Sequence, residues 1–251
     1  MPDAAPRKTM LITGASAGIG AATAIMAAQR GYDLALNYRT DHAGAEQVAT
    51  AARAAGAAVT LCPGDVADPE DIRSIYARME EAFPRLDALV NNAGIVDQTA
   101  KVTDLTHDRL RRMFDVNVIG AILIAKEAIL RMQSHGQGGG VVNVSSAAAR
   151  LGSANQYVDY AASKAAIDIF TKGLSDEVAG DNIRVNAIRP GLIETEIHAK
   201  GGQPGRAQRL AHMVPMQRTG SAEEVAESIL WLLSDQASYV TGTCLDVSGG
   251  R

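Results

Sequence analysis

Tyr160 and Lys164 are a residue pair whose types and spacing suit proton transfer. They stand four positions apart in a stretch predicted to be helical, so both side chains lie on one helix face, about one turn apart. An ammonium beside a phenol favours the phenolate and lowers the tyrosine pKa from about 10, which makes Tyr160 a usable acid and base near neutral pH. The pair alone is only suggestive. Ser146 lies fourteen positions upstream at the end of a predicted strand, where its hydroxyl can hydrogen-bond to a carbonyl oxygen presented to Tyr160.

A glycine-rich turn follows the first predicted strand and runs into an alanine-rich helix. Residues 13–20 read TGASAGIG. Glycines allow a tight turn and close approach of the backbone to a pyrophosphate, and the helix N-terminus offers free N–H groups and a positive dipole. An ordinary strand–helix turn is the alternative, but the position on the first strand of an α/β pattern favours a nucleotide site. The candidate contacts are Gly14, Ser16, Gly18, Ile19 and Gly20.

The end of the second predicted strand is expected to face the adenosine ribose of that nucleotide. NAD enzymes place Asp or Glu there to accept hydrogen bonds from the 2′-hydroxyl. This chain has Arg39 and Thr40 instead, while Asp33 lies at the other end of the strand and Asp41 lies past Arg39. The donor fork of an arginine suits a dianionic 2′-phosphate. The sequence therefore favours NADP(H), with a solvated surface arginine as the alternative.

Short apolar runs alternate with helical stretches along the whole chain. Strands are expected at 8–13, 33–38, 58–62, 86–90, 140–145, 183–188 and 243–246, and helices near 18–30, 42–55, 69–83, 106–133, 155–179 and 221–234. Parallel neighbours need long connections, so this alternation predicts a parallel sheet with crossover helices. No linker divides the chain, which predicts one α/β domain over 1–251. The stretch 191–220 has no clear strand, and we expect a substrate lid at about 192–217.

Composition excludes several classes of protein. The 251 residues include 24 Lys and Arg against 28 Asp and Glu, and 47% are hydrophobic, which is ordinary for a globular protein. The net charge of −4 argues against nucleic acid as the main partner. The histidines form no metal-binding cluster, and Cys62 and Cys244 are expected to be buried in a reducing compartment. The uncharged stretch 9–29 is too rich in Ala and Gly for a membrane span, so we expect a cytoplasmic protein with no membrane partner.

These motifs together resemble the short-chain dehydrogenase/reductase family over essentially the whole chain. The resemblance rests on the glycine-rich turn, Ser146, Tyr160 and Lys164, and on further matches in the order that the family has. These further matches are Asn91, Asn92, Ala93 and Gly94 after the fourth strand, Asn117 within a helix, Pro190 and Gly191 after the sixth strand, Thr195, and the closing residues 247–250.

The resemblance implies a single-domain Rossmann fold with a seven-stranded, doubly wound parallel sheet, often assembled as a homotetramer. It implies that Tyr160 exchanges a proton with a small-molecule carbonyl or alcohol substrate while hydride passes to or from NADP(H). Ser146 would steady the substrate oxygen, Asn117 would hold a water linking Lys164 to solvent, and Lys164 would also bind the nicotinamide ribose. The remaining cofactor contacts would be Asp65 and Val66 at the adenine, Asn92, Ala93 and Gly94, and Pro190, Gly191, Ile193 and Thr195 at the nicotinamide.

Substrate choice stays open at this point. The resemblance is greatest to 3-oxoacyl-(acyl-carrier-protein) reductases and glucose 1-dehydrogenases, and a catalytically idle NADP(H)-sensing protein is an alternative of another class. The Ser146–Tyr160 interval is one residue longer than in many members of the family, which puts any analogy of substrate in doubt. Ser145 is an alternative to Ser146, and we favour Ser146 because the family's catalytic serine is usually the later of two. Tyr157 is expected as core packing or pocket wall, and Arg150 as a solvated loop residue.

Overall fold

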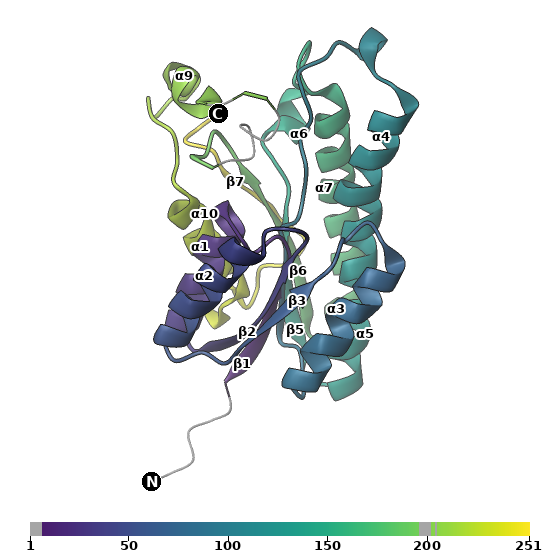
Figure 1. Ribbon diagram of the computed structural model, residues 1–251, viewed down its shortest axis with the longest axis vertical. Helices are drawn as coiled ribbons and strands as arrows, with labels where there is room; N and C mark the ends of the chain where they lie inside the picture. The colour runs from purple at the N-terminus through teal and green to yellow at the C-terminus, as the bar shows by residue number, and fades with distance from the viewer. Residues whose placement is uncertain (1–6, 196–201, 204) are drawn as a thin grey trace.

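Seven parallel strands form one sheet in the order β3-β2-β1-β4-β5-β6-β7 (Figure 1). The computed structural model describes residues 7–195, 202–203 and 205–251. The strands are β1 (Lys8–Ile12), β2 (Tyr32–Tyr38), β3 (Val59–Pro63), β4 (Ala88–Asn91), β5 (Gly139–Val144), β6 (Ile183–Pro190) and β7 (Cys244–Val247). The predicted Rossmann architecture is thereby confirmed, with strand ends that differ from the expected ones by a residue or two.

Helices cover both faces of the sheet. Figure 1 shows α1, α2 and α10 on one side and α3, α5 and α7 on the other. The helices are α1 (Gly18–Gln29), α2 (His42–Ala54), α3 (Pro69–Ala82), α4 (His107–Phe114), α5 (Ala121–His135), α6 (Ala148–Leu151), α7 (Val158–Val178), α9 (Arg206–Arg209) and α10 (Ala222–Leu233). Side chains cap the starts of two of them: Asp68 caps α3 ahead of Pro69, and Ser221 forms a capping box with Glu224 at α10.

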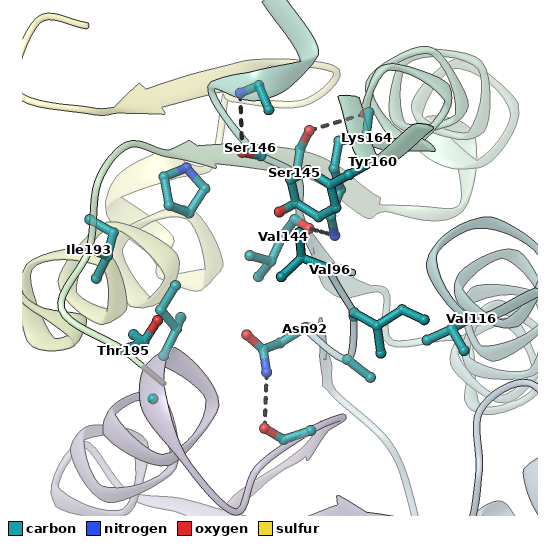
Figure 2. A pocket seen from close by; sticks show the side chains of 18 of the residues that line it. Asn92, Val96, Val116, Val144, Ser145, Ser146, Tyr160, Lys164, Ile193 and Thr195 are labelled. Carbon is teal, nitrogen blue, oxygen red and sulfur yellow. Dashed lines mark hydrogen bonds between the residues drawn. The ribbon is translucent and has the colours of Figure 1, made fainter. Parts of the chain in front are cut away.

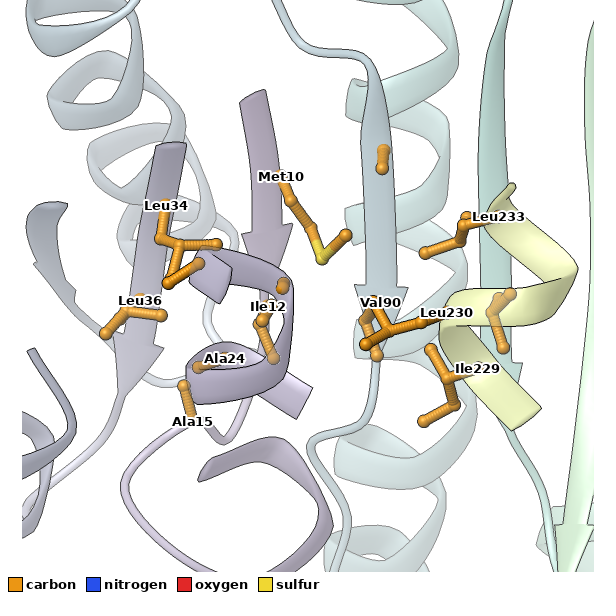
Figure 3. Packing of buried hydrophobic residues seen from close by; sticks show 14 of the residues in the cluster. Met10, Ile12, Ala15, Ala24, Leu34, Leu36, Val90, Ile229, Leu230 and Leu233 are labelled. Atoms are coloured by element: carbon orange, nitrogen blue, oxygen red, sulfur yellow. The ribbon is translucent and has the colours of Figure 1, made fainter. Parts of the chain in front are cut away.

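The core lies in two layers, one on each face of the sheet. The first layer contains Met10 and Ile12 of β1 and Leu34 of β2, which pack against α1 and α10. Ile229 and Leu230 of α10 are buried in the same layer (Figure 3). In the second, residues of α3, α5 and α7 cover the opposite face of the central strands. Because both faces are covered, the strands carry apolar runs without alternation.

The order of the strands reverses at β1, which has β2 on one side and β4 on the other. The turn after β1 is attached to both neighbours, since Thr13 N donates to Val90 O at 3.0 Å and Ala15 N donates to Asn37 O at 2.8 Å. In open α/β sheets, ligands bind in the crevice at the carboxyl ends of the strands beside such a reversal. The fold thus brings the glycine-rich turn to the place where a nucleotide site is expected.

Two helices differ from the expected ones, one in its interior and the other in its start. The expected helix over 106–133 is divided into α4 and α5 by a π-helical turn, Asp115–Gly120. A Cβ on Gly120 would strike the Val66 backbone, so close approach to the segment after β3 accompanies this turn. The expected helix over 155–179 begins only at Val158, because Asn155 has a φ of 59° that a right-handed helix does not allow.

The expected lid at about 192–217 is described only in part. Residues 196–201 and 204 lie outside the described residues. In the described part of this stretch, α9 is followed by a short 3₁₀ turn, Ala211–Met213. Elsewhere, Cys62 is buried as expected, whereas Cys244 on the edge strand β7 is only half-buried. None of the helices in the described ranges has the length and apolar character needed to cross a bilayer.

Candidate active site

Tyr160 and Lys164 lie on one face of the first two turns of α7. The Lys164 ammonium is 5.8 Å from the centroid of the Tyr160 ring and donates a hydrogen bond to Val144 O at 2.8 Å. Ser146 follows β5, directly across from them. Figure 2 shows Ser146 and Tyr160 facing the same space, opposite the loop that carries Ile193 and Thr195. The structure therefore brings the three expected catalytic side chains together from β5 and α7.

Burial governs the ionisation of this group. Burial raises the pKa of Tyr160, and a hydrogen bond with the Ser146 side chain lowers it by less. Burial also lowers the pKa of Lys164 to about 8, although the Asp168 carboxylate opposes this shift. The expected lowering of the tyrosine pKa by Lys164 is thus wrong for the free protein. The reason is desolvation, because burial of the phenol is the largest cause acting on its pKa.

The two adjacent serines have different environments. Ser145 is buried, and its hydroxyl donates to the Lys164 backbone carbonyl at 3.1 Å. Ser146 Oγ accepts a hydrogen bond from Ala148 N at 3.1 Å, and the same side chain interacts with the Tyr160 phenol. Ser145 joins β5 to α7, whereas Ser146 is the serine that a substrate oxygen beside Tyr160 would meet.

Asn117 lies in the π-helical turn and is buried. Its amide group is fully engaged: Oδ1 accepts from Ile95 N at 2.8 Å, and Nδ2 donates to Ile95 O at 2.9 Å and to Ser163 Oγ at 3.1 Å. A Cβ on Gly94 would lie 3.3 Å from both Asn117 Oδ1 and Lys164 Nζ. The side chain of Asn117 therefore holds the segment after β4 against the lysine, without lining the cavity itself.

A buried ion pair next to Tyr160 could not be read from the sequence. Asp159 has no exposed side-chain surface, and its carboxylate accepts from Arg109 Nε at 2.7 Å and from Nη2 at 3.2 Å. Arg109 Nη1 also donates to Gln98 O at 2.7 Å. The pair fastens α4 and the segment after β4 to the first turn of α7. No spacing rule links residues that are 50 positions apart, so no local signal identifies them.

A cavity of about 380 Å³ extends from the glycine-rich turn to Tyr160. The expected cofactor contacts other than Gly20 line it: Gly14, Ser16, Gly18, Ile19, Arg39, Thr40, Asp65, Val66, Asn92, Ala93, Gly94, Tyr160, Lys164, Pro190, Gly191, Ile193 and Thr195. Gly20 instead packs beneath the turn, where a Cβ would strike Gly14 O and lie 2.7 Å from Asn92 Nδ2.

The turn after β1 fits a pyrophosphate. Gly14 and Gly18 have φ values of 63° and 56°, and no side chain caps the first amides of α1. Asn92 Nδ2 donates to Thr13 O at 2.9 Å and to Gly14 O at 3.1 Å. These two hydrogen bonds fix the conformation of the turn. Uncapped amides at the positive end of a helix suit an anionic ligand.

At the adenosine end of the cavity, Arg39 is 59% exposed and its Nη1 lies 3.4 Å from Asp65 Oδ2. Asp41 caps α2 by accepting from Gly44 N at 3.0 Å, so this carboxylate is already engaged. A second cavity of about 420 Å³ adjoins this end, and Arg39, Arg111 and Arg112 are among its lining residues. Asp65, Asp108 and Asp115 line this cavity too, so the surroundings of Arg39 carry both charges. The sequence did not indicate the contact between Arg39 and Asp65.

At the opposite end, the structure adds lining residues that sequence reasoning missed. They are Val96, Arg206 and Arg251. Leu151, Ser153 and Tyr157 line the same end, and for Tyr157 this agrees with the expected pocket wall. Arg150, by contrast, is engaged with Asp246 at 3.2 Å and with the Arg251 carbonyl at 2.9 Å. Segments far apart in the chain meet here only after folding.

Comparison with known proteins gives consistent results. A family model described as enoyl-(acyl carrier protein) reductase matches residues 14–251. An uncharacterized oxidoreductase, YgfF of Escherichia coli, is 49% identical over 243 residues, which are 96% of this chain and 98% of that protein. Glucose 1-dehydrogenase 2 of Bacillus subtilis is 35% identical over 97% of this chain and 94% of its own. The crystal structure of a 3-ketoacyl-(acyl-carrier-protein) reductase from Brucella melitensis, complexed with NADH, superposes with a TM-score of 0.89 at 31% identity, covering 97% of this chain and 98% of that one.

Proposed function

Because the chain belongs to the short-chain dehydrogenase/reductase family, we propose that it interconverts a small carbonyl compound and the corresponding alcohol with NADP(H). The family assignment makes it an oxidoreductase, as the sequence predicts. The observation that supports the chemistry best is the placement of Ser146, Tyr160 and Lys164 in one cavity with the uncapped start of α1.

Each of the three side chains of this site has a separate role in proton transfer to and from the substrate oxygen. A nicotinamide cofactor, when bound, supplies or accepts the hydride. Tyr160 donates its proton to the substrate oxygen during reduction and takes one during oxidation. Ser146 donates a hydrogen bond to the same oxygen. Lys164, with a pKa of about 8, is largely protonated at pH 7, and its charge beside the Tyr160 ring favours the phenolate as the proton leaves.

The residues present fit the cofactor. The turn at Gly14 and Gly18 and the first amides of α1 would hold the pyrophosphate. Asp65 and Val66 would flank the adenine, and Ile193 and Thr195 would contact the nicotinamide. The exposed Arg39, with no Asp or Glu at the end of β2, supports NADP(H) over NAD(H).

Tyr160→Phe tests the chemistry. The variant is expected to lose turnover, followed as NADPH absorbance at 340 nm, and to keep its affinity for NADPH. Thioester, sugar and small ketone substrates are tried in parallel, because a short 3-oxoacyl thioester represents one specific alternative and glucose the other. Turnover that survives in Tyr160→Phe would contradict the assignment. A protein that binds NADPH but turns over none of these compounds would favour the idle, cofactor-sensing alternative.

Arg39→Ser tests the cofactor. Isothermal titration of the parent protein is expected to give tighter binding of NADPH than of NADH, and the substitution is expected to remove most of the difference. The choice of NADP(H) would be refuted if the parent bound NADH tenfold more tightly than NADPH, a difference of about 1.4 kcal/mol in favour of NADH. Arg53→Gln, on the exposed end of α2, is the matched control.

Assembly and location stay predictions. We propose a homotetramer, to be measured by light scattering at micromolar concentration, and a monomeric mass would contradict it. A cytoplasmic location is consistent with the two unpaired cysteines. Fractionation of the producing cells would test it.

A further inference from the structure

The substrate end of the cavity contains a buried phenol that has no hydrogen-bond partner in the described part of the chain. Tyr157 directly precedes α7, three positions before Tyr160, and its side chain lines the cavity. The residue is only 3% exposed, and its hydroxyl has no hydrogen-bond partner among residues 7–195, 202–203 and 205–251. Buried polar groups are nearly always hydrogen-bonded because leaving them unpaired costs free energy. An unpaired hydroxyl on a residue three positions before the proposed proton donor indicates a ligand atom that accepts a hydrogen bond from it.

Two arginines from distant segments border the same place. The Arg206 guanidinium lies 5.2 Å from the centroid of the Tyr157 ring and is hydrogen-bonded to the Gln156 side chain. Arg251 also lines the cavity. Its backbone carbonyl is held by Ser248 Oγ at 2.7 Å and by Arg150 Nη2 at 2.9 Å. Figure 1 shows the end of the chain beside α9, which carries Arg206.

The charges at this end are unbalanced within the described residues. Neither Arg206 nor Arg251 has a carboxylate partner among residues 7–195, 202–203 and 205–251. The acidic residues that line the cavity in these ranges, Asp41 and Asp65, are at the adenosine end. Burial lowers the pKa of Arg206, Tyr157 opposes this shift, and the like charges of Arg251 and Arg209 add to the lowering. An anion bound between the two arginines would relieve this repulsion.

We propose that the substrate of this site carries a carboxylate, which Arg206 and Arg251 bind as cations and to which the Tyr157 hydroxyl donates a hydrogen bond. The proposal deepens the proposed function and rests on it. Arginine forks match carboxylate oxygens in geometry as well as in charge.

The position of these groups limits the size of the substrate. Tyr157 and Tyr160 stand three positions apart in the chain and line the same cavity, so we expect a carboxylate against Tyr157 to lie only a few bonds from a carbonyl against Tyr160. This separation suits a short oxo- or hydroxycarboxylate. It does not suit a neutral sugar, and it does not suit a phosphate at the far end of a long acyl-carrier arm.

Matched pairs of acid and ester test the proposal. Levulinate and methyl levulinate, and acetoacetate and methyl acetoacetate, share a ketone and differ in charge. With NADPH, the parent protein is expected to have a KM for each acid about tenfold or more below that for its ester, and added salt is expected to shrink this ratio. Arg206→Gln and Arg251→Gln are each expected to bring the ratio close to one. Arg206→Lys is expected to retain part of it.

Two further variants separate a specific effect from a general one. Tyr157→Phe keeps the ring and removes the hydroxyl, so it is expected to raise the KM for the acids by several-fold more than that for the esters. Arg53→Gln, an exposed arginine paired with Glu46 on α2, removes the same charge at a distance and is expected to leave the ratio unchanged. Circular dichroism of every variant checks that it is folded.

Direct binding distinguishes this inference from the redox function. Calorimetric titration of levulinate into the NADP⁺-loaded protein is expected to give an affinity that falls about tenfold or more in Arg206→Gln. Binding of this kind without turnover of any ketone would support the carboxylate site and refute the proposed reaction. Equal KM values for acid and ester in the parent, or an acid preference that survives both arginine substitutions, would overturn the carboxylate site. Preferred turnover of a neutral sugar or thioester would overturn it as well.

Discussion

The Arg109–Asp159 pair offers a sharp test of what holds the catalytic helix in place. The Asp159 side chain has no exposed surface, the Arg109 side chain is 13% exposed, and two hydrogen bonds of 2.7 and 3.2 Å join them. The proposed proton donor, Tyr160, is the next residue. Removal of Arg109 would leave a buried carboxylate without its cation and would leave Gln98 O without its donor.

The expected effect of Arg109→Met is large. Breaking a buried ion pair from one side costs about 3–5 kcal/mol, because the remaining charge stays desolvated. At roughly 2–4 °C per kcal/mol for a chain of this size, the Tm is expected to fall by about 6–20 °C. Arg109→Met/Asp159→Leu removes both charges and fills the space, so most of the lost stability is expected to return.

Urea unfolding at one fixed protein concentration measures the free energies of this double-mutant cycle. Arg111→Met, two positions along α4, is the matched control: its ion pair with Asp115 spans 3.8 Å and the arginine is 68% exposed. The control is expected to cost less than about 1 kcal/mol. The reasoning would be refuted if Arg109→Met lost as little free energy of unfolding as the control. It would also be refuted if the double variant were no more stable than Arg109→Met.

The remaining predictions concern the lysine, two glycines and the two serines. Burial lowers the pKa of Lys164 from 10.5 to about 8, so the unfolded chain binds this proton more tightly and the native state is penalised below pH 8. Lys164→Met is therefore expected to unfold at a higher urea concentration than the parent at pH 7. Its gain in the free energy of unfolding is expected to be up to about 3 kcal/mol and to shrink as the pH rises from 8 to 10.5. Gly20→Ala forces a methyl group against the glycine-rich turn and is expected to weaken NADPH binding about tenfold or more in calorimetry. Gly173→Ala on α7 places its methyl group where nothing lies within 4 Å, and it is expected to raise the free energy of unfolding by roughly 0.5–1 kcal/mol. Ser146→Ala is expected to lower kcat by about 10²-fold or more, and Ser145→Ala to lose about 1 kcal/mol of stability with kcat retained; equal kcat values for the two would contradict the assignment.

Much of the fold follows from local pattern. The seven strands were predicted within a residue or two because a strand buried on both faces reads as an apolar run. The two differences from the expected helices arose where tertiary contacts override local preference. At Gly120 the helix meets the Val66 backbone, and at Asn155 a positive φ delays the start of α7.

The site divides in the same way. The pairing of Tyr160 with Lys164 and the position of the glycine-rich turn were predictable, because each depends on residues within one element or one turn. The ionisation of Tyr160 was not predictable, because burial and the attachment of Lys164 to Val144 O depend on packing against β5. The choice between Ser145 and Ser146 also became a matter of geometry once β5 and α7 were in contact.

The sequence by itself determined an α/β chain with a nucleotide turn at its first strand and a Ser–Tyr–Lys group, since periodicity and short spacings are properties of neighbouring residues. Only the tertiary structure decided that Arg109 pairs with Asp159, that Arg206 lies over the Tyr157 ring and that Arg251 lines the same cavity. These contacts join segments whose separation in the chain carries no information about distance in space. They exist because the packing of the helices on the sheet brings those segments together in space.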